Sequence, residues 1–171
     1  MKKIILAILL LFMIIVVVGQ VYRTSEPVKS GTFAYITDID TVTCATAETF
    51  YALSAAFVND PIVNFSIGTD EIVYNGGETK YFVIVWHATV SSEDPGRTVH
   101  VGISHNGAVL TIDSPSAMGT LIKYSNESIT MSGTEVVKLE NGDTIQIQTA
   151  SSVNDDKVIF THFTTTIRKF F

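Results

Sequence analysis

From Gly31 onward the chain alternates apolar and polar residues with a period of two, the pattern of strands that bury one face. Helical periodicity is almost absent from this part. Short runs separated by Asp, Asn, Gly and Thr predict an all-β, antiparallel jelly-roll β-sandwich. The expected strands are 31–37, 41–46, 48–53, 61–67, 71–77, 80–90, 98–104, 108–112, 121–131, 134–139, 144–150 and 157–169.

Two Asn-Gly pairs are predicted to form structural turns. Asn106 and Gly107 precede the run 108–112. Asn-Gly there favours a two-residue hairpin with both residues at positive φ. In Asn141-Gly142-Asp143 the glycine can take the positive φ of a tight turn, and the carboxylate can accept backbone N–H groups. We therefore assign Asp143 to architecture rather than to catalysis.

The run 80–90 carries apolar side chains on both of its faces. Its core set is Phe82, Ile84, Trp86, Ala88 and Val90, but Tyr81, Val83 and Val85 occupy the opposite face. Strict alternation in 157–169 likewise places Val158, Phe160 and His162 opposite Ile159, Phe163 and Ile167. A sheet with an apolar outer face packs against something else. We expect an interface between subunits formed by Tyr81, Val83, Val85, Val158, Phe160 and His162, with a covering loop or the N-terminal segment as the alternative.

The N-terminus carries a membrane signal. Lys2 and Lys3 precede the apolar run Ile4 to Val18, which has no polar face and belongs in lipid. A helix over this run reaches somewhat over ~20 Å, short of the roughly 30 Å hydrocarbon core. Residues 1–22 are therefore expected to be either a signal anchor or a cleaved signal peptide, with the lysines cytoplasmic. Residues 23–30 read as a linker, and 31–171 as the domain.

Composition argues against a nucleic-acid-binding protein and against a disulfide-stabilised one. The net charge is −6 and the basic residues are scattered, so no positive stripe for nucleic acid exists. The single cysteine, Cys44, cannot form an intrachain disulfide and is expected to be a small buried hydrophobe.

Catalytic and metal-binding patterns are missing from the sequence. A cupin-like metal site needs two histidines at alternate positions of one strand, but no H-x-H occurs among His87, His100, His105 and His162. His100 is expected to face outward, and His105 sits at a turn. No G-x-S-x-G elbow or phosphate-binding loop is found. The acidic loop tips at 93–94 and 154–156 are expected to be solvated turns. The sequence thus predicts a protein without enzymatic activity, cofactor or metal.

The order of several segments resembles the C1q/TNF-like jelly roll. The segments are "YFVIVWHATVSS" (81–92), "VHVGISHNGAVL" (99–110), "VVKLENGDTIQIQTA" (136–150) and "VIFTHFTTTIRK" (158–169). With "TAETFYALSAAFVNDPIVNFSIGTDEIVYNG" (46–76) upstream, the resemblance covers Asp38 to Lys169 and is nearest to domains of phage and other viral structural proteins. Tail-associated members lack a membrane-inserting N-terminus, so this chain fits a virus with a lipid membrane, or a cell-surface protein, better than a phage tail.

The resemblance implies a homotrimer. From it we expect a non-enzymatic structural or adhesive component of a virion (minor capsid, spike or fibre-type) that contacts other virion proteins and the membrane through residues 4–18. A host-surface receptor or a glycan is a further candidate partner. The alternative is a secreted or cell-surface C1q/TNF-like ligand-binding module of cellular origin.

Overall fold

The computed structural model describes residues 31–36, 38–54, 57–59, 64–68 and 70–170. The expected signal segment, 1–22, and the linker, 23–30, lie outside these residues. Within the described ranges, no helix is long and apolar enough to cross a membrane.

Strands make up all the regular structure of the described residues. They are β1 (Gly31–Ile36), β2 (Asp40–Cys44), β3 (Tyr51–Ala52), β4 (Phe57–Asn59), β5 (Phe65–Ile67), β6 (Ile72–Tyr74), β7 (Lys80–Ser92), β8 (Arg97–His105), β9 (Ala117–Ile122), β10 (Ile129–Leu139), β11 (Thr144–Ser151) and β12 (Asp156–Lys169).

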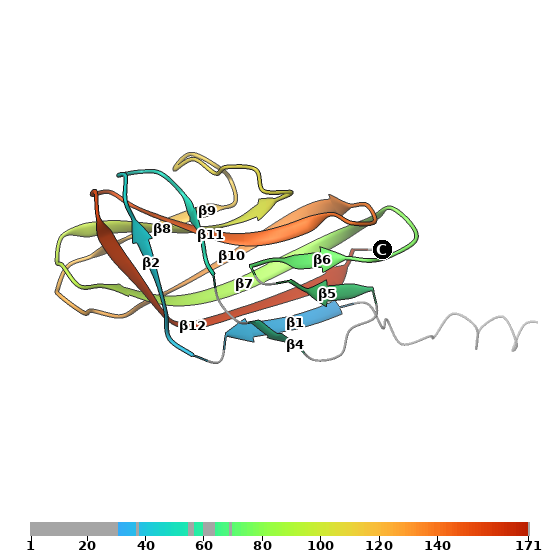
Figure 1. The fold of residues 1–171 in the computed structure, drawn as a ribbon, viewed down its shortest axis with the longest axis horizontal. Coiled ribbons are helices and arrows are strands. Elements are labelled where there is room, and N and C mark those ends of the chain that lie inside the picture. Colours follow the sequence, from blue (N-terminus) through green and yellow to red (C-terminus); the bar gives the residue numbers. More distant parts are fainter. Residues whose placement is uncertain (1–30, 37, 55–56, 60–63, 69, 171) are drawn as a thin grey trace, which may run out of the picture.

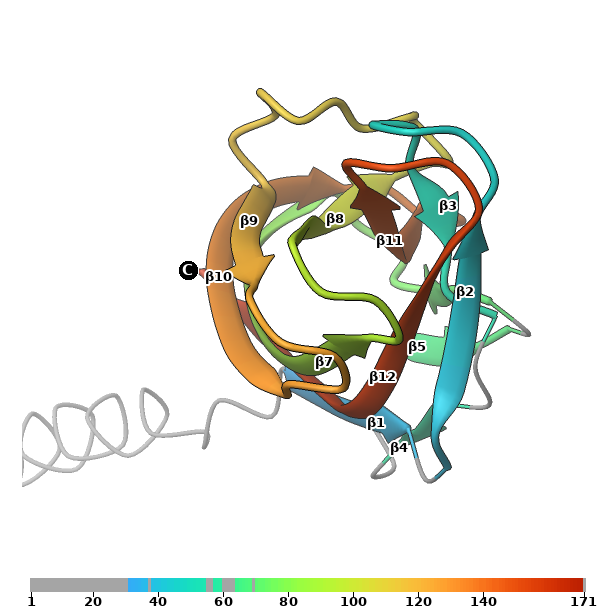
Figure 2. The same ribbon diagram turned by 90° about the vertical axis from the view of Figure 1, so that its left-hand side faces the viewer.

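The strands form two facing antiparallel sheets (Figures 1 and 2). The first sheet has the order β10-β7-β12-β1-β4, with β2 also paired to β12. The second has the order β5-β6-β11-β8-β9, with β3 also paired to β11. Strands distant in sequence are therefore neighbours, as in a jelly roll, and the predicted fold class is confirmed.

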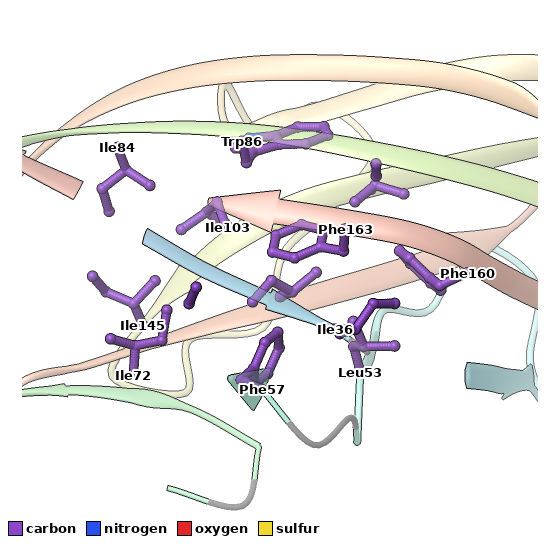
Figure 3. Close-up of a cluster of buried hydrophobic side chains, with 14 of the residues drawn as sticks. Ile36, Leu53, Phe57, Ile72, Ile84, Trp86, Ile103, Ile145, Phe160 and Phe163 are labelled. Atoms are coloured by element: carbon purple, nitrogen blue, oxygen red, sulfur yellow. The ribbon is translucent and has the colours of Figure 1, made fainter. Parts of the chain in front are cut away.

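The core fills the space between the sheets (Figure 3). The predicted core set of β7 is correct, because Phe82, Ile84, Trp86, Ala88 and Val90 are each at most 2% exposed. Gly133 of β10 pairs with Trp86. A Cβ atom on Gly133 would lie 2.5 Å from the indole ring, so the bare backbone of β10 makes room for the largest core side chain.

The expected alternation of the last strand is wrong for Val158 and Phe160. The pairing of β12 with β7 shifts by one residue between Phe160 and His162, which is a β-bulge. The extra residue changes the phase of the strand, so Val158 and Phe160 point inward before the bulge and Phe163 points inward after it. Both Val158 and Phe160 are 0% exposed (Figure 3 labels Phe160 and Phe163).

The hairpin expected at Asn106-Gly107 is also wrong in part. The turn exists, but residues 108–112 form no strand and β8 pairs with β9 instead. The loop after the turn packs on β8: a Cβ atom on Gly102 would lie 2.7 Å from Leu110 Cδ1. Leu110 N also donates to Gln148 Oε1, at 3.3 Å. This loop covers Gln148, which is 5% exposed.

Candidate functional site

Asp143 lies at the centre of a hydrogen-bonded cluster formed by the two predicted turns. Its Oδ2 accepts the Glu140 backbone N–H at 2.8 Å, and its Oδ1 accepts the Asn106 side-chain amide at 2.8 Å. Asn106 Oδ1 in turn accepts the Thr144 N–H at 2.8 Å. The Asp143 main chain binds as well, because its carbonyl accepts the Tyr74 N–H at 2.8 Å. The cluster therefore ties β6, β8 and the β10–β11 turn together.

The electrostatics of the cluster favour an ionised Asp143. The hydrogen bond from the Glu140 backbone N–H, then that from Asn106, and the nearby His105 lower the pKa of Asp143 below its ordinary value of 3.8. His105 Nε2 lies 3.1 Å from Asp143 Oδ2. Every oxygen of Asp143 is thus committed to holding the turns.

The backbone at both turns has the predicted conformation. Asn106 has φ of 52° and Gly107 has φ of 68°, while Gly142 has φ of 91°. Residues in this left-handed region are mostly glycine and asparagine. The assignment of these positions as turns is consistent with the geometry, although β10 and β11 belong to different sheets and do not pair with each other.

Beside the cluster, a groove of about 540 Å³ runs along β10, the edge strand of the first sheet. Sequence reasoning missed this groove, since it treated His105 and Asp143 only as turn residues and did not consider Glu135. The nearest signal in the sequence is Glu135 itself, a charged residue at an inward position of a strand. The lining residues are His105, Asn106, Glu135, Val136, Val137, Lys138, Glu140 and Asp143.

Glu135 points toward the interior at the edge of the sandwich. It pairs with Ile84, whose side chain is in the core, so it belongs to the inward-facing set of β10. Burial raises the pKa of Glu135, and the charge of His105 opposes that shift. Its Oε2 atom is buried and has no hydrogen-bond partner among the described residues.

The outward-facing side of β7, β10 and β12, called here the outer face, is apolar at one end. Tyr81 is 56% exposed and Val136 is 52% exposed, and Val83 and Val85 beside them are half-buried. Val83 pairs with Val136 on β10 and with Arg168 on β12. Farther along, the outer face carries His87, Thr89, Thr130, Ser132, Thr134, His162, Thr164 and Thr166.

The structure divides the six residues of the predicted interface. Tyr81, Val83, Val85 and His162 lie on the outer face, and a role of these four in assembly stays a prediction. Val158 and Phe160 are removed from the set, because both are fully buried within one chain.

Neither a metal site nor a reactive cysteine is found among the described residues. No set of three His, Cys, Asp or Glu side chains in that part of the chain is placed to hold a metal ion. Cys44 is buried, as predicted. Burial, together with the nearby Asp156 carboxylate, raises the pKa of Cys44 to about 11, so the thiol is protonated and unreactive at neutral pH.

Known proteins resemble this chain in fold rather than in sequence. No protein-family model matches the sequence, and no curated protein matches it. The crystal structure of murine APRIL at pH 5.0 is similar over 81% of this chain and 98% of its own, with 10% identity and a TM-score of 0.55. The globular domain of zebrafish complement 1qA protein is similar over 83% of this chain and 98% of its own, with 16% identity and a TM-score of 0.52.

A third solved structure with a similar fold is a viral protein. PRD1 vertex protein P5 is similar over 84% of this chain and 99% of its own, with 12% identity and a TM-score of 0.50. The fold is therefore a C1q/TNF-like jelly roll with a viral structure among its neighbours, and the predicted resemblance is confirmed.

Proposed function

We propose that this chain is a non-enzymatic structural or adhesive protein that assembles as a homotrimer through its outer face. The observation that carries the proposal is the exposed apolar end of that face, where Tyr81 and Val136 are more than half exposed. Exposed apolar clusters on a sheet are typical of surfaces that bind another protein. The C1q/TNF-like fold supports three copies of the same chain as the occupants.

In this proposal the trimer is a virion component of the minor capsid, spike or fibre type. Support comes from the similarity to a vertex protein and from the viral resemblance of the sequence. The apolar run 4–18 supports attachment to a membrane, or export across one. Other virion proteins, and a host receptor or glycan, are then the partners of the assembled trimer.

The oligomeric state of the full chain in mild detergent tests the proposal. Native mass spectrometry of the wild type is expected to show trimers at tens of micromolar. Val83→Asp places a charge in the apolar end of the outer face, where assembly would remove it from water, so this variant is expected to be a folded monomer.

A matched control carries the same substitution away from the outer face. Val109→Asp changes a 74% exposed residue in the loop after β8 and is expected to stay trimeric. Circular dichroism checks that both variants are folded. A wild type that is monomeric, or a Val83→Asp variant that remains trimeric, would contradict the proposal.

A second candidate function is a secreted or cell-surface ligand-binding module of cellular origin. The similarity to murine APRIL and to zebrafish complement 1qA protein favours it. Genes for capsid and packaging proteins next to the gene of this chain would favour the virion component over the cellular module. The mass of the mature protein separates two locations, because an intact Met1 or Lys2 indicates an anchor and a start near Gln20 indicates a released domain.

A further inference from the structure

The groove beside β10 contains a carboxylate oxygen that receives no hydrogen bond from the described residues. Within the described residues, Glu135 Oε2 is buried without a hydrogen-bond partner. The other charged side chains of the groove are paired: Lys138 Nζ lies 3.0 Å from Glu140, and His105 lies 3.1 Å from Asp143. A buried oxygen of this kind is costly to leave unpaired, which indicates a donor from outside the chain.

The outer face carries a cation that forms no ion pair within the described part of the chain. Arg168 is exposed, and none of the ion pairs found in the described residues includes it. The outward positions of β7, β10 and β12 hold no Asp or Glu that could pair with it. The outer face and the groove are therefore complementary in charge, since one offers a guanidinium and the other a carboxylate, neither of which is paired among the residues that the structure describes.

The register of the first sheet places these two groups at nearly the same level. Val136, Val83 and Arg168 form one rung across β10, β7 and β12. Glu135 precedes Val136 on β10, the edge strand. Rotation about an axis parallel to the strands keeps each residue at its own level. In a ring built by that rotation, the β10 edge of one copy meets the outer face of the next copy at the level of Arg168.

We propose that Arg168 of each copy enters the groove of a neighbouring copy and pairs with Glu135, so that every groove in the trimer is completed by another subunit. The inference rests on the proposed trimer. It adds the contact that determines which edge of one copy meets the outer face of the next copy, and at which level along the strands. Arginine suits this position because its planar guanidinium can donate two hydrogen bonds to one carboxylate.

Charge exchange in the full chain, kept in mild detergent, tests the pairing. Glu135→Lys and Arg168→Glu are each expected to raise the concentration of half-assembly at least tenfold, measured by sedimentation. The double variant restores opposite charges and is expected to return within about threefold of the wild type. Asp113→Lys makes the same charge change as Glu135→Lys in the exposed loop after β8, and is expected to assemble like the wild type.

The outcomes separate this inference from the proposed function. A monomeric wild type overturns both. A trimeric wild type whose single variants assemble normally, or whose double variant shows no recovery, overturns the pairing alone and leaves Glu135 as an inward charge that protects an edge strand. If Glu135→Lys does not fold, Glu135→Gln replaces it. The pairing then requires that Arg168→Gln cause no further loss when combined with Glu135→Gln.

Discussion

At the scale of single residues, the Asn-Gly-Asp turn between β10 and β11 stabilises the fold. Asp143 accepts hydrogen bonds from the neighbouring turn and from its own, so one carboxylate connects two loops. Gly142 supplies a φ of 91°, and Cβ at this position would meet no atom within 4 Å. The constraint on Gly142 is therefore backbone conformation alone, without a steric contribution from neighbours.

We expect Gly142→Val to lower the free energy of unfolding by about 1–3 kcal/mol, because valine is strained at positive φ. Gly77→Val is the matched control. Gly77 also has open space around its Cβ position, but its φ lies outside the left-handed region, so the same substitution there should change stability little. Urea unfolding followed by circular dichroism measures both. Equal stability of the two variants would refute the turn assignment.

The lowered pKa of Asp143 predicts a pH dependence of stability. A folded-state pKa below 3.8 means that the carboxylate stabilises the fold above that pH, and that this contribution is lost as the pH falls below it. The stability difference between wild type and Asp143→Asn should therefore shrink as the pH is lowered through about 4 toward 2.

Urea unfolding at several pH values from about 6 down to about 2 measures this difference. The same series in a His105→Gln background removes the titration of the neighbouring imidazole, which is 3.1 Å away. A difference that stays constant over the whole range would show that Asp143 does not stabilise the turns through its charge.

At the scale of elements, the bulge in β12 decides which side chains of the strand enter the core. Without the extra residue, Phe160 and Phe163 would point to opposite faces; with it, both enter the core. Phe163 packs edge-on against Phe57, with ring centroids 6.1 Å apart. The bulge therefore places apolar side chains from both halves of β12 in the core, although these residues do not follow a strict period of two.

Phe160→Ala is expected to cost about 3–5 kcal/mol, the usual range for truncating a buried aromatic side chain. Ile159→Ala, at the half-buried neighbouring position, should cost clearly less. Chemical denaturation under conditions where the protein is monomeric separates this effect from assembly. If the two variants were equally stable, the placement of Phe160 in the core would be wrong.

At the scale of the whole molecule, the two sheets have different surroundings. The loop after β8 packs on the second sheet, where Leu110 and Gln148 meet. The outer face of the first sheet keeps apolar side chains accessible, and β10 at its edge carries the groove. Both features involve β10, whose outward side belongs to the outer face and whose edge lines the groove. A single ring of copies can therefore use the face and the edge together, as tested by Val83→Asp and by the Glu135–Arg168 exchange.

The sequence by itself determined the all-β class, the inward face of β7 and the positions of the turns. These are local properties: a period of two selects the buried side of a regular strand, and Asn-Gly selects positive φ. The C1q/TNF-like resemblance followed from the order of such local segments along the chain.

Only the tertiary structure decided what depends on partners distant in sequence. The bulge in β12 depends on its pairing with β7, and it moved Val158 and Phe160 from the expected interface into the core. The loop at 108–112 packs on β8 instead of forming a strand because Gly102 leaves room for Leu110. The groove exists because β10 is an edge strand that brings Glu135 near His105. The alternation of apolar and polar residues along a strand predicts neither the order of the strands in a sheet nor which strand lies at its edge.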